Sequence, residues 1–418
     1  MAEIPPPPSR RFPLWKIVLA ALALLLVAWG VATVTIGMVS ESRWADMKER
    51  WKGLLEEARA RDRNRPALRG EPPAGNAWDD YAVAIREVRT LYELESSAPK
   101  NFLESGSGAD RTLVEKVLVR HKTIIDAVRR GASRTDASLG LEWKEGALSI
   151  PNRFGAAVVA RMAVCQARFF AEKGRTRDAV ELLVDTCRFA GDLDHVEDME
   201  PEFRELNSMI QSGLLGPAEL EQLGRELEIL DRGFPRRGHR VFLDFVALGS
   251  LFIKSGGSIT PQLVGLGADP EDALWRFGFS GRLMKTDAFE VTVNAVRRLI
   301  EADERPWLES RDLLQRITAE LTSSPNPIAR TAPDELLRSD QAHRGHLAQL
   351  RLIRMATRYR ATGELLELPD PFGDKLHHRL TEDALKIWSV GSEGKDHGGV
   401  GRFSLDGDGQ DLLLEVRR

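Results

Sequence analysis

The sequence predicts a mainly α-helical protein with a single transmembrane helix near its N-terminus. Three observations lead to this fold class. No residue between Ile17 and Ser40 is charged. Apolar residues recur at helical spacing through most of the chain, and the alternation typical of β-strands is nearly absent before residue 334. We therefore expect a membrane anchor, a helical body and a small C-terminal module that combines helix and sheet.

The predicted transmembrane helix covers residues 17–40 and binds membrane lipid. As a helix, this stretch is about 36 Å long, which exceeds the roughly 30 Å of a hydrocarbon core. It continues through bulky Val and Ile to Met38 and is longer than the apolar region of a secretory signal, which is about 7 to 15 residues. An uncleaved anchor is therefore favoured over a cleaved signal peptide or a buried core helix. Residues 1–16 contain four consecutive prolines and are predicted to be a disordered tail.

Composition excludes several classes of function. The chain has 59 basic and 63 acidic residues and a net charge of −4. Without a basic surface, we expect no nucleic acid partner. Two cysteines exclude a fold built on several disulfides and any zinc module with four thiolate ligands.

Residues 41–63 are predicted to form an amphipathic juxtamembrane helix. Its apolar positions recur at helical spacing among charges. They are Trp44, Met47, Trp51, Leu54, Leu55 and Ala58. Such a helix lies on the lipid surface or packs on the body. Packing is favoured here because its charges are mixed in sign rather than mostly basic.

The predicted body, residues 77–330, is helical, and its clearest unit is a helical hairpin from Phe154 to Ala190 with its turn at Gly174. The hairpin partly resembles a tetratricopeptide repeat, although ordinary helix-pair packing explains the same spacing. The hairpin geometry places Cys165 and Cys187 within reach of each other, as a disulfide or as two buried free thiols.

Further body helices are predicted along the chain, and one histidine lies on an apolar stripe. The helices cover about 202–213, 217–231, 238–254 and 271–321. His121 follows the apolar spacing of its helix, which is more typical of a core histidine than of a metal ligand.

The C-terminal module, residues 334–418, combines one long helix with a small sheet. The helix is predicted from Asp334 to Thr362 and ends at Gly363. Three strands are predicted to form an antiparallel sheet. They cover residues 375–380, 385–390 and 411–416.

Motifs in this module resemble the globular part of type II secretion major pseudopilins. In that family a long helix leads into a Leu-Pro-x-Asp-Pro-Trp/Phe-Gly motif, a glycine-rich loop and a final Asp-Ile strand. The matching residues are Tyr359, Gly363, Leu368, Pro369, Asp370, Pro371, Phe372, Gly373, Ser389, Val390, Gly391, Glu393, Gly394, Gly398, Gly399, Asp411 and Leu412. As a whole, the chain resembles a group of bacterial membrane proteins of uncharacterised activity.

The pseudopilin resemblance implies a calcium site in the loop before the last strand. Four carboxylates are the candidate ligands: Glu393, Asp396, Asp408 and Asp411. Hard oxygen ligands in a flexible loop suit Ca²⁺. The alternative is an acidic, solvated loop without a site.

Two pairs of histidines are candidate metal ligands. His343 and His346 are one helical turn apart, whereas His377 and His378 are adjacent on a strand and point to opposite faces. Ordinary surface histidines are the favoured interpretation of both pairs. The sequence contains no HExxH, GxSxG or Walker A motif.

These observations predict a membrane-anchored, non-enzymatic interaction or scaffold protein of the bacterial cell envelope. We expect residues 17–40 in the inner membrane, the bulk of the chain outside the cytoplasm and a protein partner for the body. One alternative is an accessory component of a pseudopilin-type secretion or surface-assembly system. A second alternative is an envelope enzyme whose active site is not recognisable from one sequence.

Overall fold

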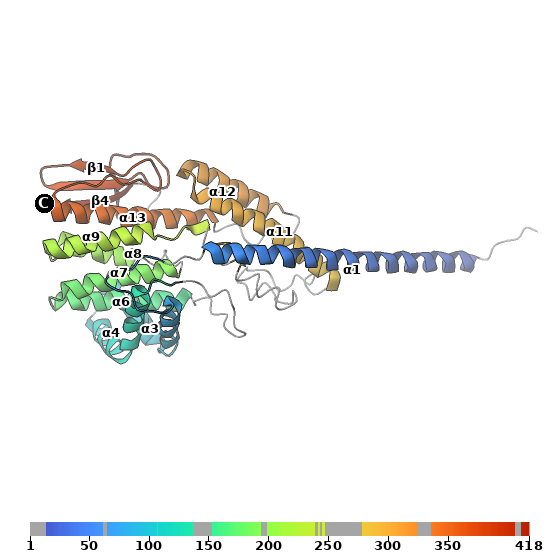
Figure 1. Cartoon of the computed structure of the whole chain (residues 1–418), viewed down its shortest axis with the longest axis horizontal. Coiled ribbons are helices and arrows are strands. Elements are labelled where there is room, and N and C mark those ends of the chain that lie inside the picture. Colours follow the sequence, from blue (N-terminus) through green and yellow to red (C-terminus); the bar gives the residue numbers. More distant parts are fainter. Residues whose placement is uncertain are drawn as a thin grey trace, which may run out of the picture.

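A computed structural model shows a long N-terminal helix that projects from a helical head, with a small sheet along the last helix (Figure 1). The mainly α-helical fold class is therefore confirmed. The structure describes residues 14–61, 65–106, 108–137, 153–193, 199–238, 241–242, 245–246, 278–324, 336–405 and 411–417.

Helix α1 (Leu14–Arg61) joins the predicted anchor and the predicted juxtamembrane helix in one continuous helix of 48 residues. No proline lies within it, so its backbone hydrogen bonds continue without a break. The apolar side chains between Leu24 and Met38 project into open space, and both of these residues are about 70% exposed. By length and composition, α1 is the only helix in the described part of the chain that could cross a membrane, a test that a signal sequence also passes.

The second half of α1 packs against α11 (Gly278–Asp303), as its mixed charges predict. The buried residues at this contact are Trp44, Met47, Trp51, Leu54 and Ala58 from α1, with Phe242, Val246, Phe289, Val293 and Val296. The rings of Trp51 and Phe289 meet edge to face with centroids 6.2 Å apart. Helix α12 (Trp307–Thr322) also packs on α11. We call α1 beyond Ser40, together with α11 and α12, the stalk.

Four short helices begin the head. They are α2 (Ala77–Val88), α3 (Glu93–Ser105), α4 (Gly108–Arg120) and α5 (Lys122–Ser133). Helix α2 packs against α5, where the buried Tyr81 ring lies so close to Gly131 that a Cβ there would be 2.3 Å from a ring carbon. His121 lies between α4 and α5 and is buried, with its Nδ1 atom 3.0 Å from a carboxylate oxygen of Glu87. It is thus a core histidine with a polar partner, as predicted.

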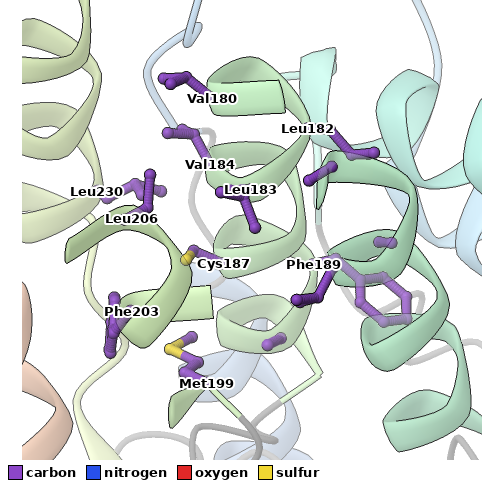
Figure 2. Close-up of a cluster of buried hydrophobic side chains, with 14 of the residues drawn as sticks. Val180, Leu182, Leu183, Val184, Cys187, Phe189, Met199, Phe203, Leu206 and Leu230 are labelled. Carbon is purple, nitrogen blue, oxygen red and sulfur yellow. The ribbon is translucent and has the colours of Figure 1, made fainter. Parts of the chain in front are cut away.

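The predicted helical hairpin is confirmed as α6 (Arg153–Glu172) and α7 (Thr176–Asp192). Gly174 turns the chain between them with a φ of +72°, a conformation that favours glycine. Helices α8 (Glu200–Gln211) and α9 (Pro217–Arg232) pack on α7, and side chains of α7, α8 and α9 meet in one apolar cluster (Figure 2). The tetratricopeptide likeness of the hairpin stays a prediction. Most of the predicted helix 238–254 lies outside the described residues.

The C-terminal module contains α13 (Leu336–Thr362) and a four-stranded mixed sheet, not the predicted three-stranded antiparallel one. The strands are β1 (His377–Leu380), β2 (Ala384–Ser389), β3 (Gly401–Arg402) and β4 (Asp411–Arg417), in the order β1-β2-β4-β3. β2 pairs antiparallel with β1 and β4, whereas β3 is parallel to β4. Strand β3 was not predicted, because a strand of two residues is too short to show an alternation of apolar and polar side chains. Gly401 allows the pairing, since a Cβ there would be 1.8 Å from the Asp411 carbonyl oxygen.

One apolar core extends from α2 to β4. Helix α13 contacts α8 and α9 as well as β2 and β4, so Ile353 and Ala356 of α13 belong to the same core as Leu385 and Leu414 of the sheet. We call α2 to α9, α13 and the sheet the head. In Figure 1 the stalk runs from the head toward the exposed N-terminal part of α1.

Candidate functional site

Residues 65–69, which we call the strap, connect α1 to the head through a buried ionic network. The guanidinium of Arg69 donates from Nε and Nη2 to the two carboxylate oxygens of Glu226, at 2.6 Å each, and from Nη1 to Asp185 at 2.7 Å. Both carboxylates are only 2% exposed. Arg69 therefore ties the strap to α7 and α9 simultaneously.

The other end of the strap is held by Arg65. Its guanidinium forms an ion pair with Asp192 and donates to the Gly131 carbonyl oxygen at 2.8 Å. The Tyr81 hydroxyl donates to the same Asp192 carboxylate at 2.6 Å, and Arg188 donates to the Pro66 carbonyl at 2.6 Å. The strap thus lies fixed across α5 and α7.

Burial shifts the pKa values of two charged side chains in this network, Asp185 and Arg188. Burial and the nearby Arg65 lower the pKa of Arg188 to about 9. Burial raises the pKa of Asp185 to about 6, although the Arg69 guanidinium acts in the opposite direction. Structural ion-pair networks perturb pKa values as active sites do, and here the acids are engaged by arginines of the strap and of α5.

A cavity of about 530 Å³ opens where the stalk meets the head. We call it the junction cavity. It lies between the end of α9 with the segment that follows it, the end of α11 and the first half of α13. Its described lining residues are Asp231, Arg232, Phe234, Pro235, Arg236, Arg237, Asp303, Glu304, Asp340, His343, Arg344, Leu347, Arg351 and Pro371.

Ion pairs fix the walls of the junction cavity. Asp231 of α9 is paired with Arg351 and Arg354 of α13. Also on α13, Arg344 pairs with Asp340 at 2.9 Å and donates to the carbonyl oxygens of Ala302 and Pro371, both at 3.2 Å. These contacts connect α9, α11, α13 and the loop before β1, so the shape of the cavity depends on all four.

His343 and His346 are buried, and the expectation that they are surface histidines was wrong. His343 is 6% exposed and packs edge to face on Phe234, while His346 is 2% exposed and packs near Phe203. Burial lowers their pKa values to about 3 and about 4, respectively. Both rings are therefore neutral at pH 7. On the sheet, His377 stacks on Trp388 with ring planes 18° apart, whereas His378 is exposed.

The predicted calcium ligands lie in the C-terminal module, and each described one already has hydrogen-bond or ionic partners. Asp411 is buried and accepts backbone hydrogen bonds from His397 and Gly399. Asp396 accepts from the Gly398 backbone and from the Trp388 indole. These hydrogen bonds lower the pKa of Asp396.

Glu393 is 3.7 Å from Nε2 of His397, and His397 Nδ1 is 3.4 Å from Asp411. Asp408 lies outside the described residues. Within the described residues, no group of three or more His, Cys, Asp or Glu side chains is arranged to hold a metal ion. The calcium site stays a prediction.

Asp370, in the segment compared above with the pseudopilin motif, connects the loop after α13 to the end of β2. Its buried carboxylate accepts hydrogen bonds from the Phe372 and Val390 backbone amides, both at 2.9 Å, and from the Ser389 hydroxyl at 2.7 Å. Three matching residues of the motif therefore converge on one carboxylate. These hydrogen bonds fix the loop after α13 to the end of β2.

Cys165 and Cys187 are buried free thiols. The Cys165 Sγ atom lies 3.8 Å from the Pro99 carbonyl oxygen on α3, whereas Cys187 lies in the cluster that also contains Met199 and Phe203 (Figure 2). Burial raises the pKa of both thiols, to about 12 for Cys165. Because the thiolate is the reactive form, both cysteines are core residues rather than nucleophiles.

Comparisons with protein-family models, with curated proteins and with solved structures found no match.

Proposed function

We propose that the protein is a non-enzymatic scaffold of the cell envelope, anchored in the inner membrane by α1, whose head holds a protein partner outside the cytoplasm. The observation that supports this most is the continuity of α1. The exposed apolar half of this helix suits lipid, and its other half is built into the stalk by Trp44, Met47 and Trp51. In this proposal the first half of α1 is the membrane anchor and its second half is part of the packed stalk.

The connection between anchor and head supports a scaffold rather than a flexible tether. Helix α1 ends at Arg61, and only three residues separate it from Arg65, the first residue of the strap. Arg65 is bound to the head through the Gly131 carbonyl oxygen. The stalk also contacts the head through Trp307, whose indole donates to the Ser392 carbonyl oxygen at 2.7 Å. A head that is held at several points presents one surface to partners in or near the membrane.

Thiol labelling in cells tests the orientation. Because both native cysteines are buried and have raised pKa values, a new surface cysteine is labelled over a low background. We expect Glu49→Cys, whose native side chain is 75% exposed, to react with a membrane-impermeant maleimide once the outer membrane is permeabilised. Ser9→Cys, in the tail, should react only after lysis. The reverse pattern would refute the orientation.

Site-specific photo-crosslinking tests for the partner. Leu94 and Val119 on the head are 76% and 82% exposed, so a photo-crosslinking amino acid is placed at each position in turn, with Glu290 of the stalk as a control site. We expect a discrete adduct from the head positions that is absent from the control. Secretion-system subunits in the adduct would instead favour the accessory component of a pseudopilin-type system. Identical patterns at head and control positions would argue against a partner for this face of the head.

A further inference from the structure

The junction cavity combines an excess of arginines with a buried hydrogen-bond acceptor. Its described lining carries five arginines against four acids. Two of the arginines, Arg344 and Arg351, are held in the walls by ion pairs. By contrast, Arg232 and Arg236 are 74% and 67% exposed, and their ion-pair partners among the described residues are the exposed Glu228 and Glu304. Exposed ion pairs are weak, so these two guanidinium groups can turn to an anion in the cavity at small cost.

The acceptor is His343, which lines the cavity from α13. Its Nδ1 atom is buried and has no hydrogen-bond partner among the described residues. Burial keeps the ring neutral at pH 7, and in the tautomer protonated at Nε2 the Nδ1 atom carries a lone pair that can accept a hydrogen bond. A buried polar atom without a partner costs free energy. A ligand with a hydroxyl or amine group would remove that cost by donating to Nδ1.

We propose that the junction cavity binds a small organic anion that also carries a hydroxyl or amine group. The anionic group pairs with Arg236 and its neighbours, and the hydroxyl or amine group donates to His343. A volume of about 530 Å³ is within the range of small-molecule sites, about 300 to 1,000 Å³. Because burial keeps His343 neutral, its Nδ1 is available as an acceptor at pH 7. This proposal does not depend on the scaffold function.

Matched ligands separate the two parts of the proposal. Isothermal titration calorimetry is performed on the full chain in detergent micelles with malate and glycerol 3-phosphate as the hydroxylated carboxylate and phosphate probes. Succinate lacks the single hydroxyl group of malate, and propyl phosphate lacks both hydroxyl groups of glycerol 3-phosphate. We expect saturable binding of one hydroxylated probe, at least about tenfold tighter than its partner without the hydroxyl, as one additional hydrogen bond predicts. Absence of saturable heat with both hydroxylated probes at millimolar concentration would overturn the proposal.

Variants assign the binding to the cavity. We expect Arg236→Ala to weaken the bound probe at least about tenfold, because a charged hydrogen bond is lost. Arg305→Ala is the matched control, since Arg305 follows the end of α11, pairs with Glu301 of that helix and is not among the lining residues of the cavity. His343→Phe should retain the packing on Phe234 but bind the probes with and without hydroxyl equally. Unchanged affinity in Arg236→Ala, or an unchanged hydroxyl preference in His343→Phe, would refute the proposal. Circular dichroism confirms that each variant is folded.

Discussion

Replacing Arg69 by methionine tests whether the strap holds the head to its anchor. The substitution removes the three hydrogen bonds to Glu226 and Asp185 and one to the Glu181 carbonyl. It leaves two carboxylates that are 2% exposed without their main partner. Breaking a buried ion pair from one side costs about 3 to 5 kcal/mol. Arg129 remains 3.6 Å from Asp185, so we expect a loss near the lower limit, about 3 kcal/mol.

The assay is urea denaturation of the full chain in detergent micelles, followed by tryptophan fluorescence. Arg177→Met is the matched control, because Arg177 is 71% exposed and pairs with Glu181 within one helix. We expect that control to change the free energy of unfolding by less than about 0.5 kcal/mol. In a double-mutant cycle, Glu226→Gln should relieve part of the Arg69→Met cost, because one buried charge is then removed. If Arg69→Met lowers the free energy of unfolding by less than about 1 kcal/mol, the ion pairs of Arg69 do not hold the strap to the head.

Three further predictions concern the core, pH and calcium. Gly131→Ala forces a Cβ to within 2.3 Å of the Tyr81 ring and should lower stability in thermal melts by about 1 to 3 kcal/mol, whereas Gly53→Ala, with open space around it, should not destabilise. His343 and His346 have folded pKa values near 3 and 4, below the unfolded value of about 6.5, so stability is fully present above pH 6.5 and is lost on acidification. The loss approaches about 1.4 kcal/mol per pH unit for each histidine near pH 5, while Asp185, with its raised pKa, contributes in the opposite direction. His346→Phe should therefore reduce the loss per pH unit by about 1.4 kcal/mol in urea titrations, and an unchanged slope would refute its burial as neutral. If the loop before β4 binds calcium, melts with millimolar Ca²⁺ and with chelator should differ, and superimposable curves would remove that site.

Periodicity predicted the helices well because most of them bury a single face. Trp44, Trp51 and Ala58 were recognised as one apolar stripe, and the structure buries them together. The same pattern did not reveal that the anchor continues into the stalk. The sequence contains the reason, since no proline or glycine lies between Gly37 and Gly53 to end the helix.

Helix α13 shows where sequence patterns fail. It is covered by α8 and α9 as well as by the sheet, so it has no single polar face and its polar residues are not all at the surface. His343, His346 and Gln349 are buried there among flanking arginines, which made the histidines look exposed. The four-stranded sheet was missed for a different reason, because β3 is too short for any periodic signal.

The junction cavity could not be predicted from the sequence at all. Its described lining comes from four separate stretches between Asp231 and Pro371, and none of them contains a recognisable motif. Only the packing of α9, α11 and α13 brings these residues together. The calcium site, by contrast, was predicted from a sequence motif alone. In the structure, the described carboxylates of that motif already have hydrogen-bond or ionic partners.

With α1 as the proposed membrane anchor, the continuity of this helix fixes the rotation of the head about the helix axis. Each residue of an α-helix advances about 1.5 Å and turns about 100°. Because the stalk is held through Trp44 and Trp51, deleting one residue between Met38 and Trp44 would turn the head by about 100° about the membrane normal while changing its height by only about 1.5 Å. The number of residues between the lipid boundary and Trp44 therefore determines which side of the head a neighbour in the same membrane meets.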